Sequence, residues 1–354
     1  MNEVHLIVPG DVDDPARPSG GNVYDRELRR GLERLGWKVH EHPVPGAWPR
    51  PAADARASLA RALQRIPDRA VVLIDGLLGS AAPEALVPHA GRLRQVPLVH
   101  MPLGHNPPAG AGSGRARERE ALWAAVTVVA TSAWGKARLT ELYGLAPERI
   151  HVAEPGVHPA PLAPGSAAGG ALLCVATVSP QKGHDVLLDG LAKVSELPWR
   201  CMCVGSLARA PDFAERVRSR ADGDGLGRRV RFTGPLTGAR LESAYAAADL
   251  LVLPSRAETY GMVVSEALAR GVPVLATEVG GVPEALGRGP GGARPGLLVP
   301  PADPAALGAA LRRWLADAEL RGRLREVARA RRGSLRRWDE TAEVVAWVLA
   351  GVAR

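Results

Sequence analysis

The residues best suited to chemistry lie in one stretch, PSRAETYGMVVSEALARGVPVLATEVGGVPE, at positions 254–284. Glu258 lies in a loop after a predicted buried strand, and Glu266 lies eight residues later, inside the helix that follows. The free backbone N–H groups at the start of this helix, around Gly261, can hold a phosphate. A nearby carboxylate can accept two hydroxyls from a sugar or a ribose. Two glutamates alone would favour the simpler interpretation of surface residues near a helix start.

The same stretch continues with an Ala-Leu-Ala-x-Gly-x-Pro-Val run and a Gly-Gly-x-x-Glu turn. Together these features resemble the donor-site signature of glycosyltransferase family 4. The resemblance implies the GT-B fold, a nucleotide-sugar donor and retention of the anomeric configuration. It also implies that Glu258 faces the transferred sugar and its reacting carbon, and that Glu266 binds the ribose hydroxyls.

The segment ALLCVATVSPQKG, at 171–183, resembles the strand and loop that open the second domain of this family. Lys182 stands where the family places a lysine on the donor diphosphate, and a lysine there can neutralise charge as the nucleotide leaves. A solvated loop lysine is the alternative, but lysine is rare in this chain and Gly183 follows directly before a helix. The family usually has an arginine five residues earlier. This chain has Thr177 there, so the cationic clamp is incomplete.

In the first half of the chain, Gly20 and Gly21 follow a long loop and precede a predicted helix. Glycines let the backbone approach a substrate closely, and the family often has such a pair. His100 ends the strand PLVH, at the edge where open α/β sheets bind ligands, and the resemblance places it near the donor sugar. His105 competes for this role, and a purely structural histidine is the alternative. Ser132 resembles another family position, but an N-cap role explains it.

The resemblance therefore implies a defined set of site residues. The catalytic residues would be Glu258, Lys182 and His100, and donor binding would involve Gly20, Gly21, Thr177, Lys182, Tyr260, Gly261, Met262, Val263 and Glu266. We expect no metal, because no cluster has metal-ligand spacing, and no cofactor, because the nucleotide-diphosphate sugar is a substrate. The match runs from about Gly20 to Glu284.

These residues need a scaffold of alternating strands and helices. In the first half, strands are predicted at Val4–Val8, Val71–Ile74, Pro97–His100 and Val126–Ala130, and helices at Tyr24–Leu35 (with Leu28, Leu32 and Leu35 on one stripe) and Ser132–Tyr143. In the second half, strands are predicted at Ala171–Ala176, Trp199–Gly205, Val230–Phe232, Leu250–Pro254 and Val272–Ala276, and helices at His184–Val194, Pro211–Ala221, Ala239–Ala247, Met262–Arg270 and Pro304–Ala316. Such alternation implies parallel sheets with right-handed crossovers. The predicted fold class is α/β, with two Rossmann-like, doubly wound domains that face each other across a cleft.

The segment PGVHPAPLAPGSAAGG, at 155–170, has no periodicity and is predicted to be the interdomain linker. A length of 354 residues fits two domains of average size. We predict an N-terminal acceptor domain over 1–160 and a C-terminal nucleotide-sugar donor domain over 161–335. The stretch Ser334–Val352 is helical, with Trp338, Ala342, Val345 and Leu349 on one stripe, and 336–354 is expected to pack back on the first domain.

The net charge of +8 is carried almost entirely by arginine. Abundant Ala, Gly and Pro indicate a GC-rich genome rather than a nucleic-acid surface, and no recognition motif of that kind is present. A basic surface still favours anionic ligands such as nucleotides. The three cysteines, Cys174, Cys201 and Cys203, include no Cys-x-x-Cys pair and are predicted to be buried free thiols. Cys201 and Cys203 should share one face of a strand.

Met1 leads almost directly into the first apolar run, which predicts no signal peptide. No segment reaches the ~18 apolar residues that span a bilayer. We therefore expect a cytoplasmic protein, with membrane association possible but not indicated.

The expected reaction moves a hexose-type sugar from a nucleotide-diphosphate sugar to a small-molecule, glycan or lipid acceptor, with no nucleic-acid partner. Acceptor specificity is expected in loops such as Gly104–Arg117. Three alternatives stay open. The chain could bind a nucleotide sugar with weak or no transferase activity, which Thr177 motivates, or cleave a glycosidic bond with phosphate or nucleotide. It could also be a peripheral membrane enzyme with a lipid acceptor, although a solvated helix face explains Arg26, Arg29, Arg30 and Arg34 more simply.

Overall fold

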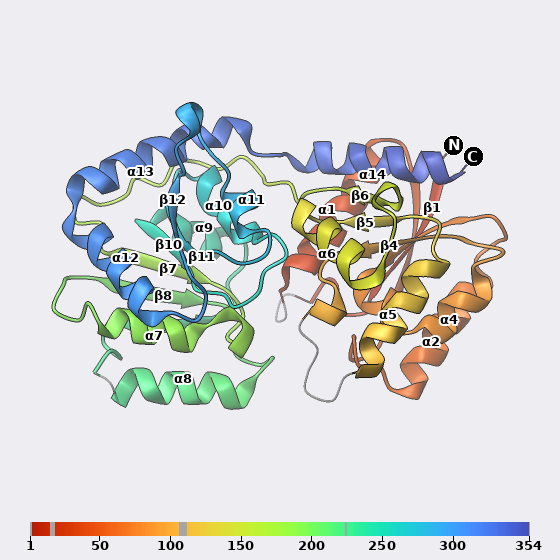
Figure 1. Cartoon of the computed structure of the whole chain (residues 1–354), viewed down its shortest axis with the longest axis horizontal. Coiled ribbons are helices and arrows are strands. Elements are labelled where there is room, and N and C mark those ends of the chain that lie inside the picture. The colour runs from red at the N-terminus through yellow and green to blue at the C-terminus, as the bar shows by residue number, and fades with distance from the viewer. Residues whose placement is uncertain (1, 15–17, 106–111, 224, 354) are drawn as a thin grey trace. The chain divides into compact units, whose positions relative to one another are not determined.

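The computed structural model describes residues 2–14, 18–105, 112–223 and 225–353. The chain forms two compact units (Figure 1). Unit 1 contains residues 2–14, 20–156 and 336–353, and unit 2 contains residues 18–19 and Val157–Leu335. Each unit is built on a six-stranded sheet, and all neighbouring strands in both sheets are parallel.

Unit 1 alternates strands and helices along the chain. Its strands are β1 (Glu3–Pro9), β2 (Lys38–Val44), β3 (Val71–Asp75), β4 (Arg94–Val99), β5 (Val128–Ala130) and β6 (Ile150–Val152). Its helices are α1 (Gly20–Arg34), α2 (Ala53–Arg65), α3 (Gly76–Gly79), α4 (Pro83–Leu86), α5 (Gly112–Ala124), α6 (Ala133–Tyr143) and α14 (Trp338–Ala353), with 3-10 turns η1 (Val87–His89), η2 (Leu103–His105) and η3 (Pro147–Arg149). The sheet order is β2-β1-β3-β4-β5-β6, so the winding direction switches between β1 and β3. Ligands of open α/β sheets bind outside the carboxyl ends of the strands at such a point.

Unit 2 follows the same plan with a different strand order. Its strands are β7 (Ala171–Val175), β8 (Arg200–Val204), β9 (Val230–Gly234), β10 (Leu250–Leu253), β11 (Val274–Thr277) and β12 (Gly296–Val299). Its helices are α7 (His184–Ala192), α8 (Pro211–Gly223), α9 (Gly238–Ala246), α10 (Met262–Ala269), α11 (Val282–Leu286), α12 (Pro304–Ala316) and α13 (Ala318–Arg331), with 3-10 turns η4 (Pro180–Lys182), η5 (Pro290–Gly292) and η6 (Arg332–Ser334). The order β12-β11-β10-β7-β8-β9 places the switch point between β7 and β10.

Both faces of the unit 2 sheet are covered, and its strands alternate between two cores. Leu172 and Cys174 of β7 pack into the core that includes α7, α8 and α12, whereas Leu173 packs into the core that includes α9, α10 and α11. Cys201 and Cys203 lie in the same core as Cys174, and all three are buried free thiols, as predicted. A sheet buried on both faces produces short continuous apolar runs, which is why these strands could be recognised from the sequence.

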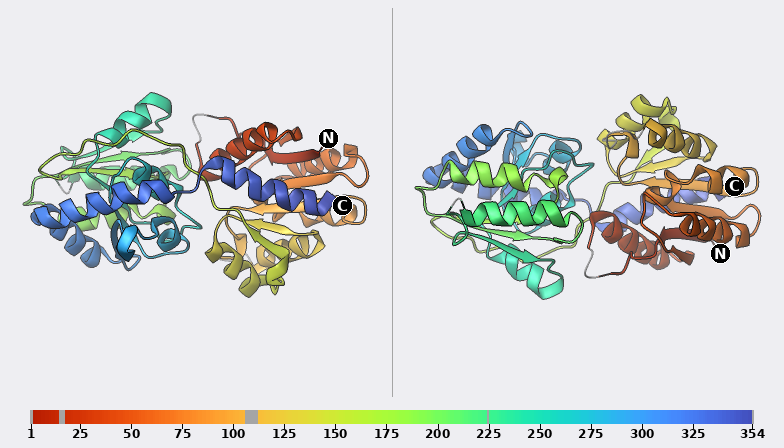
Figure 2. Two further views of the ribbon diagram at one scale, coloured as in Figure 1. Left: turned by 90° about the horizontal axis from the view of Figure 1, so that it is seen from above. Right: turned by 90° about the horizontal axis from the view of Figure 1, so that it is seen from below.

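The C-terminal helix α14 packs on α1 within unit 1, and both views of Figure 2 show the two helices together. A Cβ added to Gly31 of α1 would lie 2.4 Å from the Cβ of Ala342, so this packing depends on glycine. The rings of Tyr24 and Trp338 meet edge to face at 5.5 Å. The predicted apolar stripe is confirmed, because its four members are all buried: Trp338, Ala342, Val345 and Leu349.

Several local predictions were wrong or fall outside the described residues. Gly20 and Gly21 are the first residues of α1, so this helix begins before the predicted start at Tyr24, although glycine disfavours helices. Leu35 lies beyond the end of α1 and is 44% exposed, so it is not part of the buried stripe. Within the predicted loop Gly104–Arg117, α5 already begins at Gly112, and residues 106–111 lie outside the described residues.

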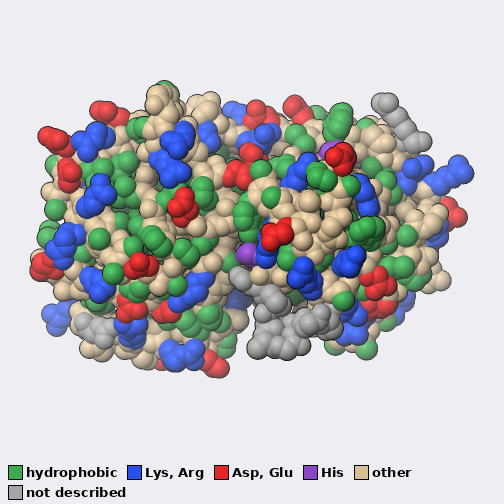
Figure 3. All heavy atoms as spheres, viewed as in Figure 1, with side chains coloured by type: hydrophobic (Ala, Val, Ile, Leu, Met, Phe, Trp, Pro, Cys, Tyr) green, Lys and Arg blue, Asp and Glu red, His purple; other side chains and the backbone are tan. Residues whose placement is uncertain are grey.

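Other local predictions hold. Ser132 is the N-cap of α6, and its side chain accepts a hydrogen bond from the Gly135 backbone N–H. Residues 153–170 contain no helix or strand. No helix of the described chain has the length and apolarity that a bilayer crossing requires. On the face shown in Figure 3, basic and acidic side chains are interspersed rather than gathered in one patch.

Candidate functional site

The sheet of unit 2 brings together two predicted site residues that are 76 positions apart. Lys182 ends η4, which follows β7, and Glu258 lies in the loop after β10, the neighbouring strand. The Lys182 Nζ donates to Glu258 Oε1 at 2.6 Å, and the two side chains are 25% and 9% exposed. Because β7 and β10 flank the switch point, this ion pair lies where ligands of such sheets bind.

Three glycines allow the loops around this pair to approach one another. A Cβ added to Gly183 would lie 2.1 Å from the carbonyl oxygen of Pro254, and one added to Gly280 would lie 1.6 Å from that of Glu258. The next residue, Gly281, would clash with the backbone of Thr259 at 2.1 Å. Gly183 and Gly280 also have φ values of +67° and +53°, which favour glycine. The Gly-Gly turn of the sequence signature therefore supports the Glu258 loop through backbone contact.

Two residues that the sequence analysis missed hold this loop in place. The Ser255 hydroxyl donates to Glu258 Oε1 at 2.8 Å. The Arg256 backbone N–H donates to the carbonyl of Gln181 at 2.7 Å, and its guanidinium binds both carboxylate oxygens of Asp185, at 2.8 and 2.7 Å. Ser255 lies three residues before Glu258 in the same loop, and this short spacing was a signal in the sequence that the two side chains could interact. The pairing of Arg256 with Asp185 bridges 71 positions and has no local signal.

Helix α10 begins at Met262 after Gly261, whose φ is +90°, and carries Glu266 in its second turn. Glu266 Oε2 accepts a hydrogen bond from the Tyr245 hydroxyl at 2.6 Å. The Arg270 guanidinium lies 4.4 Å from the centre of the Tyr245 ring and donates to the Glu266 carbonyl. Burial raises the pKa of Glu266, while the Tyr245 hydrogen bond and the Arg270 charge oppose that rise. Tyr245 thus fixes one carboxylate oxygen of Glu266.

The remaining predicted donor-binding residues surround these groups in the chain. Thr177 is half-buried in the loop after β7, where its backbone N would be 2.9 Å from a Cβ added to Gly205. Tyr260 is 7% exposed, and Met262 and Val263 are half-buried at the start of α10. Within the described chain no arginine forms an ion pair with Glu258, and Lys182 is the cation in contact with its carboxylate.

In unit 1, the third predicted catalytic residue lies in a different environment. His100 directly follows β4, and its Nε2 lies 2.9 Å from Asp25 Oδ1 and 3.7 Å from Asp75 Oδ2. A Cβ added to Gly21 would be 3.2 Å from the His100 ring, whereas Gly20 is exposed. His105, the competing histidine, instead accepts a hydrogen bond from Arg138 and contacts the Trp134 ring.

Burial governs the ionisation of this unit 1 cluster. It raises the pKa of Asp25 to about 7 and raises that of Asp75 well above its usual value. Burial also lowers the pKa of His100. The sequence analysis missed both aspartates, because Asp25 lies within an amphipathic helix and Asp75 at the end of an apolar strand. Only the fold brings them to His100.

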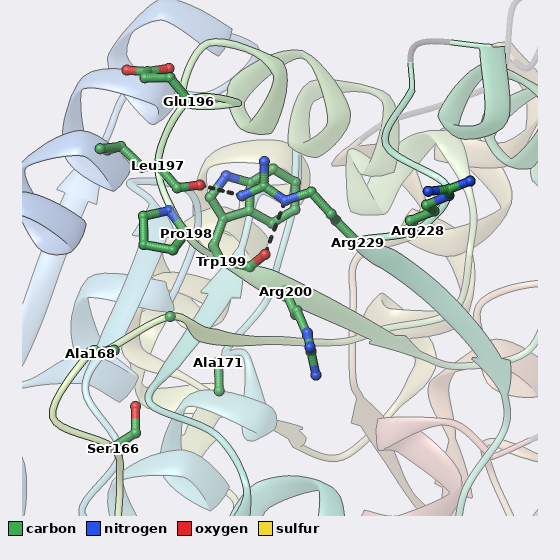
Figure 4. A pocket seen from close by; sticks show the side chains of 11 residues that line it. Ser166, Ala168, Ala171, Glu196, Leu197, Pro198, Trp199, Arg200, Arg228 and Arg229 are labelled. Carbon is green, nitrogen blue, oxygen red and sulfur yellow. Dashed lines mark hydrogen bonds between the residues drawn. The ribbon is translucent and has the colours of Figure 1, made fainter.

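A cavity of about 790 Å³ lies at the opposite edge of the unit 2 sheet, at the amino ends of β7 and β8 (Figure 4). The Arg229 guanidinium stacks on the Trp199 ring at 3.7 Å and donates to the carbonyls of Trp199 and Leu197. Arg200 and Arg228 also line the cavity and are exposed. None of the predicted site residues lines it, so we place the candidate site at the carboxyl edge.

The two-sheet architecture defines the class as GT-B. The structure aligns with the sucrose-phosphate synthase of Thermosynechococcus elongatus at a TM-score of 0.80, with 22% identity over 99% of both chains. It also aligns with Anabaena HepE in complex with UDP-glucose at a TM-score of 0.78, with 18% identity over 99% of this chain and 100% of that one. At these identities the likeness concerns the fold alone.

Sequence comparison adds the family. Residues 169–317 match the model described as "Glycosyl transferases group 1". The D-inositol 3-phosphate glycosyltransferase of Jonesia denitrificans is 33% identical over 277 residues, which cover 70% of this chain and 64% of that protein. The protein of the same name from Acidothermus cellulolyticus is 36% identical over 242 residues, or 62% and 52% of the two chains. This chain therefore spans less than two thirds of these relatives. These similarities support a family 4-like glycosyltransferase, as the sequence signature indicated.

Proposed function

We propose that this chain transfers a hexose-type sugar from a nucleotide-diphosphate sugar to an acceptor hydroxyl, with retention of configuration. The observation that carries this proposal is the Lys182–Glu258 ion pair at the β7/β10 switch point, in the loop that leads into α10. Supporting it, Glu266 lies in α10 and has one carboxylate oxygen fixed by Tyr245. The cytoplasm would supply such donors, and no cofactor or metal is part of the proposal.

Each residue then has a defined task. The backbone N–H groups at Met262 and Val263 would bind the diphosphate at the helix N-terminus, together with Lys182. Glu266 would accept the ribose hydroxyls. The bond between the anomeric carbon and the phosphate oxygen breaks while the acceptor oxygen attacks from the same side, and the acceptor proton passes to the leaving phosphate. Charge develops on that phosphate, so Lys182 is most valuable in the transition state.

The ion pair also suggests how the buried Glu258 carboxylate is neutralised when no donor is bound. Glu258 is nearly buried, and an unpaired carboxylate there would be costly. Lys182 offsets this cost when no donor is present. Because an ammonium has three N–H donors, Lys182 can bind a phosphate oxygen while still donating to Glu258. The other Glu258 oxygen would accept a sugar hydroxyl, with His100 near the donor sugar, as the family resemblance implies.

The names of the two relatives suggest the first acceptor to test. We propose a phosphorylated cyclitol of the inositol phosphate type as the acceptor. A glycan or lipid acceptor, or donor binding with little or no transfer, would be the other outcomes of the same assay.

A two-stage experiment tests the proposed function. Thermal-shift screening against a panel of nucleotide sugars should identify the donor, because a ligand that binds only the folded state raises the melting temperature. Product formation from that donor is then followed with inositol phosphate, free inositol and water as acceptors. Glu258→Gln is the site variant in both stages. Glu319→Gln is its matched control, because the Glu319 side chain is 90% exposed on α13. Absence of a shift with every nucleotide sugar would refute the proposal, and a shift without turnover would support a binding protein.

A further inference from the structure

Three side chains meet at the carboxyl edge of the unit 1 sheet. Asp75 ends β3, beside the β1/β3 switch point, and His100 follows β4. Asp25 reaches them from the second turn of α1. Both aspartates are 1% exposed and the His100 side chain is 16% exposed, so this is a buried cluster with one accessible member.

The cluster places two carboxyl groups together in a buried environment, so their ionisation must be compensated. Two ionised carboxylates buried side by side are strongly unfavourable without a compensating charge. Among the ion pairs of the described residues, His100 is the partner of both Asp25 and Asp75. Arg26 favours the ionised form of Asp25, but Glu41 of β2 opposes it. The neighbouring Tyr24 is neutral, because burial raises its pKa, and Arg336 acts on Tyr24. Burial lowers the pKa of His100, and a neutral His100 would compensate neither of two ionised carboxylates.

One added proton is enough to give each of the four carboxylate oxygens a hydrogen-bond partner. Asp75 Oδ1 accepts the Leu77 backbone N–H at 2.5 Å, as the N-cap of α3. Asp25 Oδ1 lies 2.9 Å from His100 Nε2. The Oδ2 atoms of both aspartates are buried and have no hydrogen-bond donor in the described chain. One carboxylate oxygen of each aspartate lies within 4.8 Å of the other, and each carboxyl group shifts the pKa of its neighbour. A proton on Asp75 that is donated to Asp25 pairs both Oδ2 atoms.

We propose that Asp25 and Asp75 share one proton at neutral pH and act as positioning residues for His100. Asp25 then accepts the Nε2–H of His100 and fixes that tautomer, which leaves Nδ1 as a hydrogen-bond acceptor. No described residue bonds to Nδ1. The accessible face of the cluster would therefore bind a neutral hydroxyl rather than a phosphate. The use of His100 by substrate rests on the proposed function, but the shared proton does not.

A divalent cation is the competing way to neutralise the cluster. One ligand atom from each of Asp25, Asp75 and His100 lies within 4.8 Å of the others, and two carboxylates with one imidazole suit manganese or zinc. The two solutions make opposite predictions for Asp75→Asn. An asparagine amide can replace the protonated Asp75 as a donor to Asp25, but it removes a charged metal ligand.

The first experiment uses the full chain without any substrate. Asp75→Asn should leave His100 as the Nε2–H tautomer in nitrogen-15 NMR of histidine-labelled protein. Asp25→Ala, or Asp25→Asn if the alanine variant fails to fold, should change the tautomer balance or the titration of His100. The exposed Asp68→Asn, whose side chain is 78% exposed, is the matched control. An Nδ1–H tautomer in the wild-type protein would overturn the proposal.

Melting curves against pH give a second readout. An aspartate whose pKa is raised on folding contributes most at low pH, and its contribution is lost as the pH rises through the folded-state pKa. The wild-type protein should therefore lose stability relative to Asp75→Asn as the pH rises above about 4, the unfolded carboxyl range, because the pKa of Asp75 is raised well above its usual value. Asp68→Asn should show no such trend. A melting difference independent of pH would contradict the shared proton.

Metal and activity measurements complete the test. Purified protein and protein titrated with MnCl₂ or ZnCl₂ should show no stoichiometric binding. One ion per chain, lost in Asp75→Asn, would establish the cation instead. If the proposed sugar transfer is also found, Asp75→Asn should lower kcat less than Asp25→Ala does, because the asparagine amide can still donate to Asp25. Asp25→Ala should lower kcat by roughly tenfold, the upper range for one positioning hydrogen bond. If transfer is never observed, the NMR and melting results still decide the shared proton.

Discussion

The carboxyl edges of the two sheets handle buried charge in opposite ways. In unit 2, Lys182 and Glu258 neutralise each other directly, and the lysine is partly exposed. In unit 1, Asp25 and Asp75 are more deeply buried and their strong partner is a histidine. The two sheets follow the same topological rule, so the difference comes from the side chains at the switch points. The Lys182 ammonium can bind an anionic ligand, whereas a carboxyl pair that shares a proton can only orient His100.

The largest effect is expected from Lys182→Ala. It removes the cation that would stabilise the leaving diphosphate, at a cost of about 2.7–4 kcal/mol in the barrier, or roughly 100- to 1000-fold in rate. Steady-state kinetics measure this, with Lys193→Ala as the control, because Lys193 is an exposed lysine of the same unit. The double variant Lys182→Ala/Glu258→Gln distinguishes the loss of the catalytic cation from the effect of leaving the Glu258 carboxylate unpaired. Wild-type turnover in Lys182→Ala would leave the mechanism without its main cation.

Glu258→Gln should reduce the transfer rate by ~100-fold, on the scale of losing a positioned catalytic contact. Nucleotide binding should survive, because Lys182 is then freed from its 2.6 Å contact with the carboxylate. Calorimetry with the nucleoside diphosphate and single-turnover kinetics measure the two quantities separately. The assignment fails if turnover is near normal, and Glu319→Gln controls for the loss of one acidic group.

Glu266→Ala should mainly weaken donor binding, because ribose hydroxyls do not change during the reaction. The loss of a charged hydrogen bond corresponds to about 1.5–3 kcal/mol, or roughly 10- to 100-fold in donor affinity. Tyr245→Phe, which removes the hydroxyl that holds Glu266, should weaken it less. A lower maximal rate with intact donor affinity would show that Glu266 does not bind the ribose.

Thr177→Arg should tighten nucleoside-diphosphate binding by restoring the second cation of the family pattern. The expected gain is a few-fold, because a partly exposed charge pair contributes only about 0.2–1 kcal/mol. Calorimetry gives the affinity, and stopped-flow release of nucleotide shows whether product leaves more slowly. Unchanged affinity would mean that position 177 does not face the phosphates.

The smallest effect concerns stability, and it should again separate the units. In unit 1, His5 stacks on His40 and His42, and burial and these neighbours lower the pKa of His5 to about 4. A lowered histidine pKa contributes stability that is complete above about pH 6.5 and is lost as the pH falls toward about 4. Hydrogen exchange at pH 7.5 and 5 should therefore show greater loss of protection in β1 and β2 than in β7 and β8.

His5→Gln should reduce this acid sensitivity without affecting unit 2. Equal loss of protection in both units, or no change in His5→Gln, would remove the histidine stack as the cause.

The accuracy of the sequence-based predictions follows strand position. Most predicted strands, such as Leu250–Pro254, lie inside a sheet, where burial on both faces produces an apolar run; the exception is Val230–Phe232, which belongs to edge strand β9. The strands with no prediction, β2, β6 and β12, are all edge strands. An edge strand has a pairing partner on one side only and tolerates polar residues, as in the KVHEHPV segment of β2. The start of α1 was predicted at Tyr24 and lies at Gly20, because the low helix propensity of glycine conceals the first turn.

The sequence by itself determined the α/β class, the aperiodic segment at 155–170, the family signature from Glu258 to Glu284 and the rarity of lysine that drew attention to Lys182. These are local properties, because periodicity and motif spacing are written along the chain. Only the tertiary structure decided that Lys182 meets Glu258, that Arg256 binds Asp185, and that Asp25 and Asp75 surround His100. The physical reason is that parallel strands from distant parts of the chain end at one sheet edge. Contacts across that edge depend on strand order, and no local pattern encodes strand order.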